Sequence, residues 1–112
     1  MTNYELRVTN EALPNSRTAD IIAKQILRSA TSVGANYRAA VRAKSTADMI
    51  NKLKIVEEEA DETLYWLELL IEAHLVAEAR LADLMPETNE IIAMTVSSLK
   101  TLRAKQKATR HS

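Results

Sequence analysis

Residues that interrupt helices are almost absent from this chain. Gly34 is its only glycine and Pro14 and Pro86 are its only prolines, while alanine, leucine, glutamate, lysine and arginine dominate the rest. Such a composition favours helix at nearly every position and offers few turn residues for a sheet. The 112 residues suffice for one domain with a modest core. The sequence therefore predicts a single all-α domain over residues 1–112.

Apolar residues at helical spacing and capping signals divide the chain into elements. The expected elements are a short helix or arm over 1–15, long helices over 16–44, 45–75 and 77–107, and a frayed tail over 108–112. Ser16 or Thr18 can cap the first long helix, and Ser45 with Asp48 three residues later resembles a capping box for the second. Pro86 kinks the last helix or marks its restart.

Gly34 lies inside the helix expected over 16–44, where a glycine costs about 1 kcal/mol relative to alanine. On a helical wheel it shares an apolar stripe with Ala30, Tyr37 and Val41, about 100° from a first apolar stripe. A helix with two apolar stripes packs on both sides, so we expect another backbone or a large side chain to approach Gly34. A local kink is the alternative interpretation.

The helix expected over 45–75 also carries apolar residues beyond its core stripe. Trp66 is the only tryptophan of the chain, and an off-core tryptophan among aliphatic residues is typical of an interface anchor. Cover by the short N-terminal segment is the alternative. The two faces together predict self-association. The expected interface residues are Ala30, Gly34, Tyr37, Val41, Ile55, Trp66, Leu69 and Leu70.

The charges of the chain cancel but are segregated. Residues 1–54 carry nine Lys/Arg against four Asp/Glu, residues 55–99 carry one against eleven, and residues 100–112 carry five against none. The simplest interpretation is that acidic and basic helices face each other. A local basic surface for RNA or DNA is the second interpretation, because cations clustered on one face contact phosphates. The candidate residues for that surface are Arg28, Arg38, Arg42, Lys44, Arg103, Lys105, Lys107 and Arg110.

Signals of catalysis are missing from the sequence. The acidic run over 57–62 resembles a metal-binding pattern, but neither His74 nor His111 has the glutamate three residues earlier that di-iron bundles use. A solvated or salt-bridged acidic face, and a helix-terminal role for His74, are the simpler interpretations. There is no cysteine, no nucleophile motif and no phosphate-binding glycine loop. We expect no catalytic residue, no metal and no cofactor, and a cytoplasmic protein without a membrane span.

Two sequence blocks are distinctive together. One is R-S-x-T-S-x-G-A-N-Y-R-A-A over 28–40, and the other is K-L-x-I-x-E-E-E-A-D-E-x-x-Y-W-L-E-L-L over 52–70. With these blocks the chain resembles the bacterial four-helix-bundle family first noticed as proteins encoded in 23S rRNA intervening sequences. The resemblance covers residues 13 to about 104.

The resemblance implies an antiparallel up-down four-helix bundle that assembles as a ring, commonly a pentamer, without enzymatic activity. It implies a homo-oligomeric scaffold that binds RNA, DNA or a nucleoprotein partner. Related bundle proteins are accessory factors of diversity-generating retroelements, so an accessory subunit of a reverse transcriptase is the alternative. Family members usually have a longer helix before the Ala-Leu-Pro motif found here at 12–14. The first helix is therefore expected to be shortened, and either vestigial or completed by another chain.

Overall fold

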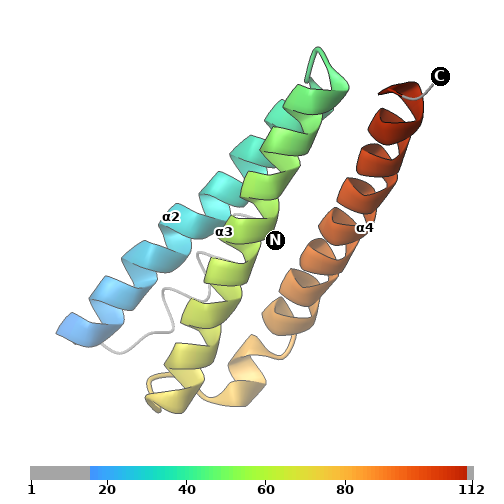
Figure 1. The fold of residues 1–112 in the computed structure, drawn as a ribbon. Coiled ribbons are helices and arrows are strands. Elements are labelled where there is room, and N and C mark those ends of the chain that lie inside the picture. Colours follow the sequence, from blue (N-terminus) through green and yellow to red (C-terminus); the bar gives the residue numbers. More distant parts are fainter. Residues whose placement is uncertain (1–15, 111–112) are drawn as a thin grey trace.

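The computed structural model describes residues 16–110, which form three long α-helices and one short 3-10 helix. The elements in chain order are α2 at Arg17–Val41, α3 at Thr46–Glu72, the 3-10 helix η1 at Glu78–Leu81, and α4 at Leu84–Arg110. Successive long helices run in opposite directions, and α3 packs against both α2 and α4 (Figure 1). The molecule is a rod of 58 × 20 × 20 Å. The prediction of an all-α fold is confirmed.

Serine side chains begin the first two of these helices. The Ser16 hydroxyl accepts a hydrogen bond from the Ala19 backbone N–H at 3.1 Å, and the Ser45 hydroxyl accepts one from the Asp48 N–H at 3.1 Å. Each bond satisfies a backbone donor that the first turn of a helix leaves without a partner. Ser16 rather than Thr18 is therefore the cap of α2, and Ser45 caps α3 as its spacing from Asp48 predicts.

His74 lies where the chain leaves α3. Its φ is 57°, in the left-handed region that usually ends a helix at glycine. The backbone N–H groups of Leu75 and Val76 then donate to the carbonyl of Leu70, at 3.0 and 3.4 Å. This exposed histidine is the helix-terminal residue that the sequence predicts, and it turns the chain toward η1.

The last helix differs from its expected bounds of 77–107. A 3-10 turn occupies Glu78–Leu81, and α4 begins only at Leu84, so Pro86 lies in its first turn. Proline is tolerated there because the first backbone N–H groups of a helix have no partner within it. The helix runs to Arg110, which makes residues 108–110 helical instead of a frayed tail. The segment 1–15 and residues 111–112 lie outside the described part.

The expected four-helix count is not met among residues 16–110, where three α-helices are present. Their core has two parts along the rod. Two sets of buried side chains form it: Ile22, Ile26, Ala30, Leu67, Leu70, Val76, Leu81 and Leu84 at one end, and Ala40, Ile50, Leu53 and Leu99 toward the other. The second set shows that the latter half of α4 lies level with the end of α2 and the start of α3.

Between these two parts the core contains buried hydroxyl groups. The hydroxyls of Ser29 on α2 and Thr63 on α3 are buried and lie 2.8 Å apart. The Thr63 hydroxyl also lies 2.8 Å from the Glu59 carbonyl of its own helix. The Thr88 and Thr95 hydroxyls of α4 are buried too, and they donate to carbonyls one turn earlier. These hydroxyls lie beside the buried Val56 and Ala60 of α3, and a cavity is present between α2 and α4 at this height.

Candidate nucleic-acid interface and apolar groove

One end of the rod carries an excess of basic side chains. We call it the basic end and define it as residues 36–56 and 95–110, which contain ten Lys/Arg and one acidic residue, Asp48. Its cations come from the end of α2, the turn after it, the start of α3 and the second half of α4. They are Arg38, Arg42, Lys44, Lys52, Lys54, Lys100, Arg103, Lys105, Lys107 and Arg110.

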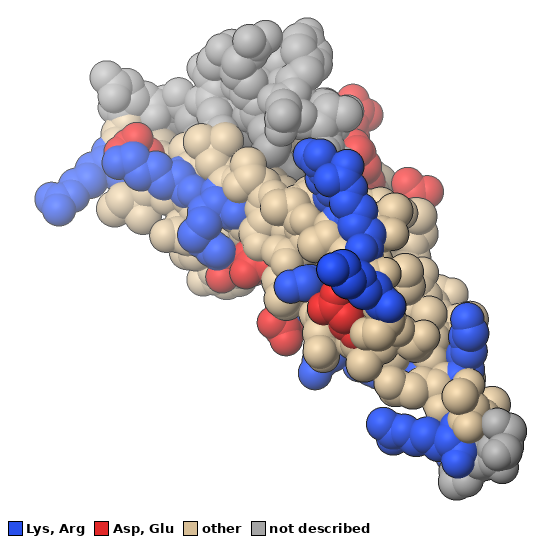
Figure 2. Space-filling view, turned by 90° about the horizontal axis from the view of Figure 1, so that it is seen from above, with Lys and Arg blue, Asp and Glu red and all other residues tan. Residues whose placement is uncertain are grey.

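The cations of the basic end face solvent. All are exposed except Lys52, which is half-buried. Among residues 16–110, no ion pair involves any of them. Figure 2 shows Lys and Arg side chains in blue along the visible face. At the lower right end of this view all charged side chains are blue. Seven of the eight residues predicted to contact nucleic acid lie in this region, and Arg28 is the exception.

Arg28 lies near the middle of α2, and its guanidinium group binds side chains of the same protein. Its Nη1 is 3.1 Å from Glu59 Oε2, and its Nη2 pairs with Glu62. Its Nε donates to Gln25 Oε1 at 3.1 Å. Arg28 therefore lies outside the basic end, and three groups of the same protein take up its donors.

The opposite charges of the chain separate along the rod. Residues 16–35 and 57–94 carry four Lys/Arg against twelve Asp/Glu. Only the Arg28 pairs link α2 to α3 by charge among the described residues, and Arg38, Arg42, Lys52 and Lys54 form no ion pair with the acidic run. The interpretation that acidic and basic helices face each other therefore holds only at Arg28 among the described residues. The molecule has a basic end and an acidic end instead.

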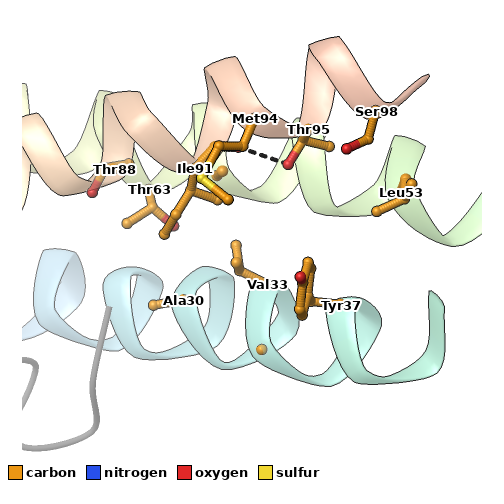
Figure 3. A pocket seen from close by; sticks show the side chains of 12 residues that line it. Ala30, Val33, Tyr37, Leu53, Thr63, Thr88, Ile91, Met94, Thr95 and Ser98 are labelled. Carbon is orange, nitrogen blue, oxygen red and sulfur yellow. Dashed lines mark hydrogen bonds between the residues drawn. The ribbon is translucent and has the colours of Figure 1, made fainter. Parts of the chain in front are cut away.

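An apolar groove runs between α2 and α4, with α3 as its floor. Its central cavity has a volume of about 280 Å³ and is lined by Val33, Gly34 and Tyr37 on one side and by Ile91 and Met94 on the other. Figure 3 shows Val33 and Tyr37 pointing from α2 toward the α4 residues. A second hollow continues it along Tyr37, Val41 and Leu102. Large apolar side chains at its rim are exposed: Tyr37 by 53%, Val41 by 64% and Met94 by 62%.

Gly34 borders this groove without a close neighbour. A Cβ added at this position would meet no atom within 4 Å. The α2 helix continues through it from Arg17 to Val41, so neither a break in α2 nor a close contact with another described residue explains the glycine. The expected close approach to Gly34 is absent among the described residues, and the glycine leaves open space at the groove.

The predicted interface residues fall into three groups. Gly34, Tyr37 and Val41 are exposed along the groove. Leu70 is fully buried in the core of the protomer, so its assignment to an interface is wrong, whereas Ala30 is buried in the core and also lines the groove. The remaining residues, Ile55, Trp66 and Leu69, are half-buried on α3.

Trp66 belongs to the packing of the protomer. It packs against the core cluster that contains Leu67 and Leu70. The centroid of one of its rings lies 5.0 Å from that of Tyr65 in an edge-to-face arrangement. Its indole N–H is buried and meets no acceptor in the part of the chain that the structure describes. Trp66 therefore supports the bundle itself, and the groove carries the exposed apolar surface.

Sequence reasoning missed several residues of these two surfaces. Lys52, Lys54 and Lys100 belong to the basic end, and Met94 belongs to the groove. Lys100 could have been found, because it lies three residues before Arg103 on the same helix face.

Among residues 16–110 no group of three or more His, Cys, Asp or Glu side chains is placed to hold a metal ion. No helix of that range has both the length and the apolarity needed to cross a bilayer.

The comparisons with known proteins agree with this architecture. The model of the 23S rRNA-intervening sequence protein family matches residues 3–97. The crystal structure of a protein of unknown function from the S23 ribosomal protein family of Bacteroides thetaiotaomicron is similar, with 40% sequence identity and a TM-score of 0.79. The match covers 87% of this chain and 90% of that chain. No curated protein matches. This chain belongs to the family of 23S rRNA-intervening sequence proteins.

Proposed function

We propose that this protein is a non-enzymatic scaffold that self-associates through the α2–α4 groove and binds RNA or a nucleoprotein through its basic end. The observation that carries the proposal is the charge of one end of the rod. Ten Lys/Arg side chains and a single acidic residue gather there. A zero net charge would not attract nucleic acid, whereas a local excess of cations does so by releasing the counterions of the phosphates.

The groove supports the self-association. Contiguous exposed apolar residues are uncommon on a monomer and usually mark an interaction site. Here Tyr37, Val41 and Met94 are each more than half exposed. Tyr37 and Met94 line the cavity beside Gly34, and Val41 lines the hollow that continues it. A second copy of the chain is the partner we assign to this groove, in a ring that is commonly a pentamer in proteins it resembles. A ring brings several basic ends together and multiplies the local positive charge.

A native mass spectrum tests both halves of this proposal. The protein is purified at low ionic strength without nuclease, so that bound nucleic acid is retained. We expect an oligomer that carries nucleic acid, which nuclease or high salt removes. An oligomer that never carries nucleic acid contradicts binding at the basic end. A monomer at micromolar concentration contradicts self-association through the groove.

A further inference from the structure

Four cations of the basic end form a line on α4. Lys100, Arg103, Lys107 and Arg110 are exposed and lie within an arc of about 80° on the helix surface. They follow each other over about 15 Å of the helix axis. We call them the α4 cationic stripe. Lys105 lies on the opposite side of the same helix, where the groove is.

Interactions within the protein do not account for the stripe. Among residues 16–110 no ion pair involves its members, and α4 has no Asp or Glu between Ile91 and Arg110. Cations in the last turn are stabilised by the helix dipole, which explains Lys107 and Arg110. Lys100 and Arg103 lie well before that turn, so the dipole does not explain them. Aligned, unpaired cations of this kind fit an external anion that is itself linear.

The dimensions of the stripe fit a nucleic-acid duplex. A strand of duplex DNA has a phosphate about every 3.4 Å along the axis, so a helix lying along it passes about four phosphates in 15 Å. Proteins that read single strands stack the bases on aromatic side chains. No aromatic residue is present in α4. The stripe can therefore contact phosphates, but α4 offers no aromatic side chain to bind unstacked bases.

We propose that the α4 cationic stripe binds the phosphate backbone of a nucleic-acid duplex without regard to base sequence. This inference rests on the proposed function and specifies the partner of its basic end. It adds Lys100 to the contact residues and removes Lys105 from them. Duplex RNA and duplex DNA offer the same phosphate chemistry, and the test below compares them.

The test measures the affinity of the full chain for labelled nucleic acid by fluorescence anisotropy over a series of salt concentrations. The probes are a short RNA duplex, a DNA duplex of the same sequence and the corresponding single strands. Each phosphate contact contributes about 0.9 to the slope of log K against log salt for duplex DNA. We expect the four residues of the stripe to contribute about −3.6 to the slope on the DNA duplex. The affinity for a duplex should exceed that for a single strand.

A matched pair of variants locates the contacts. Lys100→Gln/Lys107→Gln removes two charges from the stripe and should reduce the magnitude of the slope by about 1.8. Lys24→Gln/Lys105→Gln also removes two exposed lysines, neither of which lies on the stripe, and should leave the slope unchanged. Circular dichroism of both variants checks that the helices are retained. Equal binding to the RNA and DNA duplexes is expected, because the stripe contacts phosphates alone.

The outcomes separate this inference from the proposed function. If both variants reduce the slope equally, diffuse charge binds nucleic acid and the stripe does not, which overturns the inference and leaves the scaffold function standing. A preference for single strands, or for one duplex over the other, also overturns it. If the unmodified protein binds none of the probes at low salt, the inference and nucleic-acid binding by the basic end fail together.

Discussion

At the scale of single residues, His74 stores a small amount of backbone strain. Its φ of 57° lies in a region that costs a side-chain-bearing residue about 1 kcal/mol or more, whereas glycine adopts it freely. We predict that His74→Gly raises the free energy of unfolding by about 0.5–1 kcal/mol. Urea denaturation measures the change. His74→Ala keeps the strain and serves as the control, so equal stabilities of the two variants would contradict the prediction.

Gly34 gives the second prediction at this scale. A methyl group at this position enters open space, since a Cβ would meet no atom within 4 Å. We expect Gly34→Ala to raise the free energy of unfolding by about 1 kcal/mol, the difference in helix propensity. The measurement is made at a concentration where the protein is monomeric. A loss of stability there would mean that a neighbour from the same chain packs against Gly34.

At the scale of elements, local chemistry decides how much the sequence reveals. The serine caps of α2 and α3 could be predicted, because a cap needs only residues three positions apart. The start of α4 could not be predicted, since Pro86 is compatible both with a kink and with the first turn of a helix. The burial of Leu81 in the core follows from packing, and the 3-10 turn before α4 carries this residue inward.

The contact between α2 and α3 yields an element-scale prediction. Ser29 and Thr63 are buried with their hydroxyls 2.8 Å apart, and they join the two helices in one register. A double-mutant cycle of Ser29→Ala and Thr63→Val should show a coupling of about 1 kcal/mol, because a buried hydrogen bond contributes about that much. Thermal unfolding of the four proteins gives the value. Additive effects would mean that the two hydroxyls do not stabilise each other.

At the scale of the whole molecule, the direction of the charge separation could not be predicted from the sequence. The composition of each segment shows that charges are segregated, but it does not show where the boundary falls in space. The acidic run begins at Glu57, about halfway along α3, so the boundary crosses the rod instead of lying between two helices. Seven of the eight predicted basic contacts nevertheless gather at one end. Arg28 differs because one turn of α3 brings Glu59 and Glu62 to it.

The groove yields a prediction about the proposed oligomer. Met94 and Val96 are both exposed on α4, by 62% and 46%, but only Met94 lies at the groove. If a second copy covers the groove, a charge at Met94 must be desolvated in the contact, which is unfavourable without a partner. We therefore predict that Met94→Glu dissociates the oligomer, whereas Val96→Glu leaves it intact. Analytical ultracentrifugation measures the mass of each variant. Since both substitutions occur at exposed positions of one helix, a difference between them reports on the groove and not on the stability of the protomer. Dissociation of both variants or of neither would contradict a subunit contact at this groove.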